Sequence, residues 1–526
     1  MTQKIDWELF KALYWHCPSM QIGFDISRMG VGSDYFDGKK DQVAAAISAM
    51  KDLESGAIAN PDEKRMVGHY WLRNADLAPS ADLRDEIKKT FCDVKQFATD
   101  VRAGKIKAAA GNYTDVLHIG IGGSALGPQF IHDALGGDRV LKMHFIDNTD
   151  PDGVLKVLSE IPDLSRTLVV VVSKSGGTKE TRNGQLLVQA AFKKAGLDYS
   201  KSFVAVTGVG SALDKTAVAE GWLARFPMWD WVGGRTSLWS AVGLLPAALE
   251  GIDIAALLSG AAAMDVATRE ASALKNPAIM LALMWCRGAA EGKAMVVLPY
   301  KDRLMFLSRY LQQLVMESLG KEFDLDGKTV NQGLTVYGNK GSTDQHAYVQ
   351  QLREGPNNFF TLFISVLNDL CGEGGAEIGG MEVEPEVTSG DFLLGFLLGT
   401  REALSEKGRQ SMTLSLPTVD AKNVGALLAL FERAVGFYAS FVNINAYHQP
   451  GVEAGKKAAG SVLETQVRIL ETLKGSSEPL SVEELAKRLN MQGDEDIIFA
   501  IVRHLAGNKR IKVQAGVAVT EDRYSF

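Results

Sequence analysis

The 526-residue sequence predicts an α/β protein with two parallel sheets, each covered by helices, and a further small domain at its C-terminus. Three observations support this prediction. The chain is too long for one hydrophobic core, so two or three domains are expected. Short, continuously apolar segments alternate with segments of helical length, which is typical of parallel sheets buried on both faces. Glycine, at 53 of 526 residues, is concentrated in short runs beside Ser, Thr and Lys.

The composition is that of a globular protein. Hydrophobic residues make up 46% of the chain and charged residues 23%, which excludes a disordered, collagen-like or coiled-coil protein. Asp and Glu (63) outnumber Lys and Arg (56), so the net charge is −7. Such a chain has no overall positive field, so neither nucleic acid nor an anionic membrane is an expected partner. An anionic ligand must be held by a local site.

The first residues and the cysteines predict a cytoplasmic protein. The first residues, MTQKIDWELF, lack the apolar segment of a signal peptide, and no run of 18 apolar residues without charge predicts a membrane span. The four cysteines are far apart and form no CxxC or Cys/His cluster, so neither a disulfide nor a metal site is expected. They are Cys17, Cys92, Cys286 and Cys371.

Residues 1–110 are expected to form a helical region. The clearest helix begins after Ser80, where apolar residues recur three or four positions apart until Gly104 ends the pattern. This apolar stripe consists of Leu83, Ile87, Phe91, Val94, Phe97 and Val101.

The two sheets are expected within residues 111–255 and 256–460. Four apolar segments predict the strands of the first sheet: residues 116–119, 143–146, 168–172 and 203–206. A long helical stretch follows, to about residue 285. The strands of the second sheet are predicted from residues 295–298, 334–337 and 359–366.

The segment DVLHIGIGGSALGP predicts a strand that leads through a glycine loop into a helix. Gly123 and Ser124 lie in this loop. Glycines there allow backbone N–H groups to approach an anion, and the helix N-terminus adds partial positive charge. A plain strand-to-helix turn is one alternative. A dinucleotide site is the other, and it is disfavoured because Ala125 occupies the position of the third glycine of that fingerprint.

The segment VVVVSKSGGTKET predicts a second loop of this kind on a neighbouring strand. Ser173, Lys174, Ser175 and Thr178 follow the four valines directly. Hydroxyls, backbone amides and one ammonium at the carboxyl end of a parallel strand suit a phosphate group. The spacing is not that of a nucleotide P-loop. Two such loops together favour an anion site over a polar loop without a ligand.

Two further segments offer groups for acid–base chemistry. In DWVGGRTSLWS, Arg235 follows Gly233 and Gly234, so its guanidinium can lie close to a ligand and stabilise an oxyanion. A packed structural arginine is the alternative.

In residues 304–320, Glu317 lies in the last turn of a predicted helix, with Gln313 one turn earlier on the same side. Glu317 is a candidate general base, and a solvated helix-end residue is the alternative.

His346, in GNKGSTDQHAYVQQLREG, and Lys456, in YHQPGVEAGKKAAG, are two further candidates. A single histidine or lysine is more often structural than catalytic. These two gain weight only from the motifs that accompany them.

Taken together and in this order, six motifs resemble those of the glucose-6-phosphate isomerase family over about residues 60–460: HIGIGGSALGP, SKSGGTKET, WVGGRTSLW, MESLGK, GSTDQHAYVQQL and PGVEAGK. The segment GNKGSTDQHAYVQQLREG is similar to cyanobacterial and plastid members. The resemblance implies two sugar-isomerase (SIS) domains. It also implies reversible conversion of glucose 6-phosphate into fructose 6-phosphate, in glycolysis and gluconeogenesis, with no cofactor and no metal.

The resemblance also implies roles for individual residues. Glu317 matches the base that moves a proton between C2 and C1, and Arg235 matches the residue that stabilises the enediolate. Lys456 and His346 match the residues that assist ring opening. His346 reaches the site of the other subunit in the family, which implies at least a homodimer. The implied substrate contacts are Gly123, Ser124, Ser173, Lys174, Ser175, Thr178, Gly234 and Gln313.

Two other functions stay open on the sequence alone. A non-catalytic sugar-phosphate sensor has no need for Glu317, Arg235, His346 and Lys456 together, so their joint presence argues against it. A related aldose–ketose isomerase, such as one acting on mannose 6-phosphate, is disfavoured by the MESLGK and GGR elements.

Residues 461–526 are expected to form a separate domain. A capping box of Ser481 and Glu484 begins a predicted helix over residues 482–489, a further helix covers residues 497–505, and a hairpin is expected over residues 510–519. This order is typical of a winged-helix domain, many of which bind DNA. Nine Lys and Arg against ten Asp and Glu favour docking on the enzyme or a neighbouring subunit over DNA binding.

Overall fold

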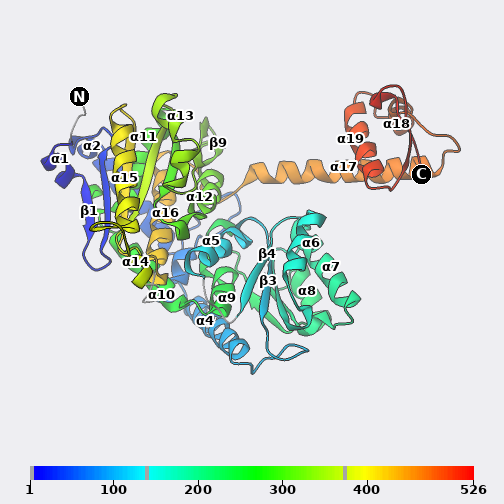
Figure 1. Ribbon diagram of the computed structural model, residues 1–526, viewed down its shortest axis with the longest axis horizontal. Coiled ribbons are helices and arrows are strands. Elements are labelled where there is room, and N and C mark those ends of the chain that lie inside the picture. The colour runs from blue at the N-terminus through cyan, green and yellow to red at the C-terminus, as the bar shows by residue number, and fades with distance from the viewer. Residues whose placement is uncertain (1–4, 137–140, 371–375) are drawn as a thin grey trace. The chain divides into compact units, whose positions relative to one another are not determined.

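The computed structural model describes residues 5–136, 141–370 and 376–526. Cys371 and the side chains of residues 376, 452–454, 456 and 457 lie outside the described part of the chain. Two units are distinguished, Met1–His448 and Gln449–Phe526. Figure 1 shows two sheets in the first unit and a long helix followed by shorter elements in the second.

The N-terminal region contains strands as well as helices, so the expectation of a helical region is wrong for residues 14–28. β1 (Tyr14–Cys17) and β2 (Ile22–Arg28) form an antiparallel pair. Apolar residues alternate in β2, but its partner β15 (Gln410–Leu416) is distant in the sequence. The helices are α1 (Trp7–Ala12), α2 (Asp34–Asp37), α3 (Lys40–Glu54) and α4 (Ala81–Arg102), and 3-10 turns cover His69–Leu72 and Ala75–Leu77. The predicted start of α4 is confirmed, since the Ser80 side chain accepts a hydrogen bond from the Leu83 amide.

The first sheet is fully parallel, in the order β4-β3-β5-β6-β7. Its strands are β3 (Asp115–Ile119), β4 (Lys142–Ile146), β5 (Thr167–Val172), β6 (Phe203–Thr207) and β7 (Ala224–Pro227). The four predicted strands are confirmed, and β7 is an addition. The connecting helices are α5 (Leu126–Leu135), α6 (Pro151–Glu160), α7 (Lys179–Lys194), α8 (Ala212–Ala219) and α9 (Ala241–Glu250).

Both faces of this sheet are buried, which explains its continuous valine runs. Val169 and Val171 belong to one apolar cluster with Val188 and Phe192 of α7. Val170 and Val172 belong to the main core of the unit, on the other face. Every second residue of β5 therefore contacts a different layer of helices.

The second sheet is mixed, in the order β1-β2-β15-β12-β8-β11. β8 (Ala294–Pro299), β11 (Val336–Tyr337), β12 (Phe359–Val366) and β15 are parallel, and β1 and β2 extend the sheet antiparallel. β11 is shorter than predicted, and β15 was not predicted. The helices around it are α10 (Ile254–Ala267), α11 (Pro277–Ala290), α12 (Leu307–Leu311), α13 (Val349–Glu354), α14 (Ala376–Gly379), α15 (Ser389–Ser405) and α16 (Ala421–Phe441). Two short hairpins complete the unit: β9 (Lys321–Phe323) with β10 (Thr329–Gln332), and β13 (Glu382–Glu384) with β14 (Val387–Thr388).

α16 is long and apolar enough to cross a membrane by length and composition, but 94% of that stretch is buried inside the protein. It packs against α10, α11 and α3 and is the central helix of the core.

The second unit contains α17 (Pro450–Lys474), α18 (Val482–Leu489), α19 (Glu495–Gly507), β16 (Lys512–Gln514) and β17 (Arg523–Ser525). Its own core includes Ile469 and Leu473 of α17. The predicted capping box of Ser481 and Glu484 is confirmed. The hairpin pairs residues 512–514 with residues 523–525, so its second strand lies later than predicted. The boundary expected between residues 460 and 461 falls inside α17, and the two units divide between His448 and Gln449.

Candidate active site

Both predicted anion loops lie at one point of the first sheet. β3 pairs with β4 on one side and with β5 on the other, so the chain reverses its direction across the sheet between β3 and β5. Open parallel sheets bind ligands at such a point, beyond the carboxyl ends of the strands. The glycine loop follows β3, and the SKSGGT loop follows β5. The topology therefore brings the two loops to the same edge.

The glycine loop is in close contact with the loop that contains Arg235. Gly122–Ser124 form a 3-10 turn in which Gly122 has a φ of 57°. A Cβ atom added to Gly123 would lie 1.9 Å from the carbonyl oxygen of Gly234. Any side chain at position 123 would therefore separate the two loops. A Cβ atom added to Gly122 would lie 3.1 Å from Nε2 of Gln313, which places that amide beside the glycine loop.

His118, near the end of β3, forms a hydrogen bond to the glycine loop. Its Nε2 lies 2.6 Å from the carbonyl oxygen of Ser124. Burial lowers the pKa of His118 to about 4, so the ring is neutral at physiological pH and donates its Nε2–H to the carbonyl. The sequence analysis did not single out this residue. A histidine inside an apolar strand is the signal that could have identified it.

Lys174 ties the SKSGGT loop to the segment that precedes Arg235. Its Nζ donates to the carbonyl oxygens of Asp230 and Val232, each at 2.9 Å. Burial lowers the pKa of Lys174 to about 8. The ammonium thus contacts backbone oxygens of the neighbouring loop, and a direct phosphate contact for it stays a prediction.

The other residues of the SKSGGT loop differ in their surroundings. Ser173 is buried, and its hydroxyl has no hydrogen-bond partner within the described part of the chain. The Ser175 hydroxyl accepts a bond from the Gly177 amide at 3.2 Å. Thr178 directly precedes α7, and its side chain makes no capping hydrogen bond. Amides at the start of α7 and the hydroxyls of Ser173 and Thr178 therefore offer donors to an anion.

Arg235 and Glu317 form the central pair of the site. Nη1 of Arg235 lies 2.9 Å from Oε1 of Glu317. Arg235 is 8% exposed, and its Nη2 also donates to the Ala446 carbonyl oxygen at 2.7 Å. Burial lowers the pKa of Arg235, and the adjacent Glu317 carboxylate opposes that shift. A fixed guanidinium thus lies beside a partly accessible carboxylate.

Glu317 ends a π-helical turn, Gln312–Glu317, that continues α12. Such turns are rare and are frequent at functional sites. Lys321 closes this turn, since its Nζ donates to the carbonyl oxygens of Glu317 and Ser318 at 2.8 and 2.7 Å. Burial lowers the pKa of Lys321 to about 8. Lys321 is a second residue of the site that the sequence analysis did not single out.

Among the described residues, His346 forms no hydrogen bond or ion pair with Arg235 or Glu317. His346 ends a 3-10 turn, Thr343–His346, and is exposed. Lys456 belongs to α17 in the second unit, and its side chain lies outside the described residues. Their roles stay predictions. Among the described residues, no group of three or more His, Cys, Asp and Glu could hold a metal ion.

A family model described as phosphoglucose isomerase matches residues 38–371 and 400–477. The chain belongs to the phosphoglucose isomerase family. It is 55% identical over 530 residues to the glucose-6-phosphate isomerase of Synechococcus elongatus, with 100% of this chain and 98% of the relative covered. It is 54% identical over 522 residues to glucose-6-phosphate isomerase 1, chloroplastic, of Arabidopsis thaliana, with 97% and 84% covered.

A solved structure supports the same assignment. The crystal structure of a glucose-6-phosphate isomerase from Chlamydia trachomatis aligns with a TM-score of 0.77 at 27% identity, covering 88% of this chain and 92% of that one. The predicted α/β fold and the resemblance to cyanobacterial and plastid members are therefore confirmed. So is the predicted activity: the enzyme interconverts glucose 6-phosphate and fructose 6-phosphate, a step of glycolysis and gluconeogenesis.

Proposed function

We propose that the loops around Arg235 and Glu317 form the active site for this isomerisation. The observation that supports the proposal most directly is the 2.9 Å contact between the Arg235 guanidinium and the Glu317 carboxylate. An aldose–ketose isomerase has to remove a proton from carbon and stabilise the negative charge that results. A carboxylate base and a permanent cation at one place supply both functions.

In the proposed reaction, one carboxylate moves one proton. After ring opening, Glu317 removes the proton from C2 of the aldose, and the electron pair forms the C1–C2 double bond of a cis-enediolate. The former carbonyl oxygen O1 takes the negative charge, which Arg235 stabilises. The hydroxyl proton of O2 passes to O1, and as Glu317 returns its proton to C1, the electron pair of O2 forms the C2 carbonyl group of the ketose. His346 and Lys456 are the proposed groups for ring opening.

The phosphate group is proposed to bind between the two loops at the edge of the first sheet. Gly123, Ser124 and the residues before α7 offer backbone amides there, and Ser173, Ser175 and Thr178 offer hydroxyls. Gln313 and Gly234 lie beside the glycine loop and complete the proposed substrate contacts. Lys174 contributes positive charge while it holds the loops together. Binding of this remote group can be used to align the reacting carbons.

We also propose a homodimer in which His346 acts in the partner's active site. His346 is exposed, and the Nε2 amide of its neighbour Gln345 donates to the Phe396 carbonyl oxygen of α15 at 3.2 Å. The outer face of α15 exposes Leu394, Phe396 and Leu398. An exposed apolar face next to an exposed histidine suits a contact between subunits.

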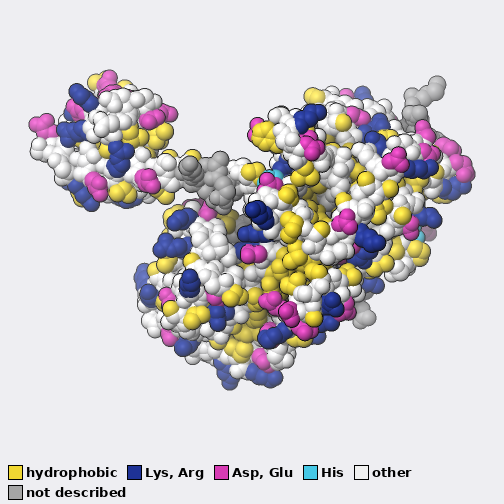
Figure 2. All heavy atoms as spheres, turned by 180° about the vertical axis from the view of Figure 1, so that it is seen from behind, with side chains coloured by type: hydrophobic (Ala, Val, Ile, Leu, Met, Phe, Trp, Pro, Cys, Tyr) yellow, Lys and Arg dark blue, Asp and Glu magenta, His cyan; other side chains and the backbone are white. Residues whose placement is uncertain are grey.

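The remaining proposals concern location and other partners. A cytoplasmic location agrees with Cys17, Cys92 and Cys286, which are free thiols. No role for nucleic acid is proposed, because acidic and basic side chains alternate over the visible face of the second unit in Figure 2. Residues 461–526 have a net charge of −1.

The role of Glu317 is tested by Glu317→Gln in a coupled assay that converts fructose 6-phosphate and detects NADPH through glucose-6-phosphate dehydrogenase. A general base contributes about 10²–10⁴-fold, so kcat should fall by that factor while a phosphorylated competitive inhibitor binds as before. Glu322→Gln is the matched control, because Glu322 lies five residues away and is exposed. A loss below about tenfold in Glu317→Gln would remove Glu317 from this role.

The dimer is tested by mixing two inactive variants, Glu317→Gln and His346→Ala. In a hybrid dimer, one of the two sites contains both Glu317 and the partner's His346, so activity should return after subunit exchange. No rescue after confirmed exchange would mean that each site is built from one chain.

A further inference from the structure

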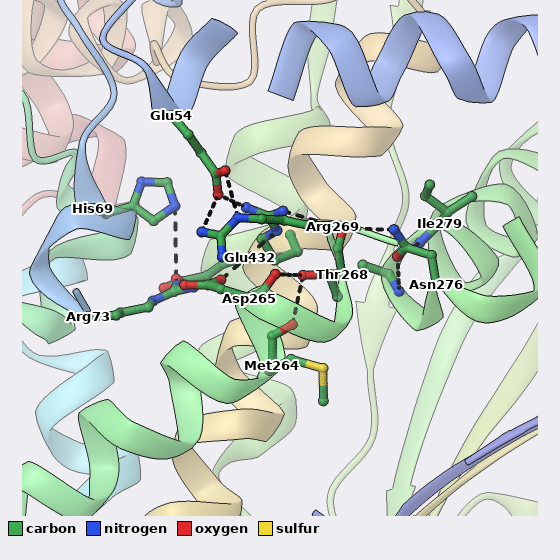
Figure 3. A network of polar contacts seen from close by, with 12 residues as sticks. Glu54, His69, Arg73, Met264, Asp265, Thr268, Arg269, Asn276, Ile279 and Glu432 are labelled. Atoms are coloured by element: carbon green, nitrogen blue, oxygen red, sulfur yellow. Dashed lines mark hydrogen bonds and ion pairs between the residues drawn. The ribbon is translucent and has the colours of Figure 1, made fainter. Parts of the chain in front are cut away.

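Glu432 is a buried carboxylate that the proposed reaction does not use. It lies in the middle of α16, where Glu432 and Arg433 interrupt an otherwise apolar helix. Its side chain is 0% exposed. Its ion pair with Arg73 lies in the network of Figure 3, together with Asp265, His69 and Glu54. A buried charge of this kind is costly unless every one of its oxygen atoms is satisfied.

The Glu432 carboxylate accepts hydrogen bonds from two other segments. Nε1 of Trp239 donates to both oxygens, at 3.0 Å to Oε1 and 2.8 Å to Oε2. The Tyr310 hydroxyl donates to Oε1 at 3.2 Å. All three side chains are buried. One carboxylate therefore joins two segments that are distant in the sequence.

These two segments contain the central pair of the active site. Trp239 ends the 3-10 helix Gly234–Trp239, which includes Arg235. Tyr310 lies in α12, which continues directly into the π-helical turn that ends at Glu317. The Arg235 segment and the Glu317 segment thus share one attachment to α16, through Trp239 and Tyr310.

We propose that Glu432 is a positioning residue, which holds the Arg235 segment and the Glu317 segment in the alignment that proton transfer requires. The inference rests on the proposed function, because it assigns Glu432 to the same reaction. An apolar residue at this position could fill the space, but it could not accept hydrogen bonds from Trp239 and Tyr310 at once. Apolar packing alone would make the fold as stable as this buried charge does. The need to accept both hydrogen bonds explains why a carboxylate is present at this position.

The rest of the network holds this carboxylate in place. Arg73 is the counterion of Glu432, and its Nη1 also contacts Oδ1 of Asp265 at 2.6 Å. Arg433 pairs with Glu54. Nε2 of His69 lies 4.0 Å from Oε2 of Glu432, and burial together with Arg73 and Arg433 holds the pKa of His69 well below its usual value. His69 is therefore neutral and does not compete with Arg73.

Glu432→Met is the main test, and Asp265→Asn is its matched control. Both variants remove a buried carboxylate next to Arg73, but Trp239 and Tyr310 donate their hydrogen bonds to Glu432. Methionine is chosen over glutamine because a glutamine oxygen in the place of Oε1 could still accept both hydrogen bonds. Misplacement of reacting groups by about 1 Å can cost about 10²-fold. We therefore expect kcat of Glu432→Met to fall about tenfold or more, with KM changed less than about twofold, because no hydrogen bond among the described residues joins the phosphate loops to Glu432.

A second readout reports on the proton-transfer step itself. With substrate deuterated at C2, the isotope effect on kcat should rise in Glu432→Met and stay at the wild-type value in Asp265→Asn. Equal losses of kcat in the two variants, or an effect of Glu432→Met on KM alone, would overturn the positioning role and leave a purely structural one.

Tyr310→Phe provides a second test in case Glu432→Met does not fold. It removes one hydroxyl and leaves the Glu432–Arg73 pair intact. We expect kcat to fall several-fold at unchanged KM, and the losses in the double variant Tyr310→Phe/Glu432→Met to be less than additive. Wild-type kcat in Tyr310→Phe overturns the inference. An active Glu317→Gln enzyme contradicts the proposed function instead, whatever the Glu432 variants do.

Discussion

Gly123→Ala should separate the two loops on which the active site depends. A Cβ atom at position 123 would lie 1.9 Å from the oxygen and 2.3 Å from the carbon of the Gly234 carbonyl group. Both are backbone atoms, which cannot rotate away as a flexible side chain can. Contacts of a real Cβ atom below 3.0 Å essentially never occur, so one of the loops has to move by at least about 1.1 Å.

That displacement would reach the proposed catalytic pair, Arg235 and Glu317, directly. Arg235 follows Gly234, and its Nη1 is 2.9 Å from Oε1 of Glu317. A displacement of about 1 Å can cost about 10²-fold in rate, so kcat/KM should fall by roughly that factor. The free energy of unfolding should fall by about 1–3 kcal/mol, the usual cost of overpacking. The folded protein should persist, because the first sheet and its core are not touched.

The coupled assay and urea denaturation measure these two quantities. Gly233→Ala is the matched control, since its Cβ atom would meet only Oγ1 of Thr236 at 3.5 Å, an ordinary contact. Its kcat/KM should stay within about twofold of wild type, because surface substitutions without strain have small effects. A Gly123→Ala enzyme with the same kcat/KM as Gly233→Ala would refute the reasoning, because the close contact between the loops would then not constrain Arg235.

Three further predictions concern other residues. The lowered pKa of Lys174, about 8, means that its ammonium is present below that pH and lost above it, so kcat/KM should fall above about pH 8. Lys174→Arg should remove this decline, and a decline that persists belongs to another group. The free energy of unfolding should rise from about pH 8 to about 10.5, because the unfolded chain binds that proton more tightly. His118→Phe leaves the Ser124 carbonyl without its hydrogen bond and should lower the free energy of unfolding, measured by urea denaturation, by about 1–3 kcal/mol. An unchanged free energy of unfolding would show that this bond does not stabilise the protein. Deletion of residues 461–526 should leave activity measurable and alter stability or assembly in sedimentation, and salt-dependent binding of DNA by this unit would contradict its assignment.

The sequence predicted best those elements whose burial is evident in a short window. The valine run of β5 is buried on both faces, so its residues are apolar at every position and the strand was predicted within one residue. β2 has no continuous apolar run, because Gly23 and the buried polar residues Asp25 and Ser27 separate its apolar residues. Its hairpin partner β1 is near in the sequence, but its other partner, β15, is distant, and no short window contains it. The strand was therefore missed.

The site shows the same division between local and distant information. The anion loops were predicted because their glycines and hydroxyls are adjacent in the sequence. Glu432 was missed because its proposed function depends on Trp239 and Tyr310, which lie in other segments. A Glu–Arg pair inside an apolar helix was the available signal, since buried charges need partners. The role of Lys174 in joining two loops was equally invisible, because its acceptors are backbone oxygens.

Because α17 is continuous, a movement of the C-terminal unit can be transmitted along it to Lys456, which is proposed to act in ring opening. Lys456 lies near the start of this helix, and Leu473, near its end, is anchored in the core of the second unit. At about 1.5 Å per residue, the two positions are about 25 Å apart on one rod. A tilt of about 10° at the anchored end therefore displaces the lysine end by about 4 Å. A partner that binds the C-terminal unit and turns it could therefore shift Lys456, the residue proposed for ring opening.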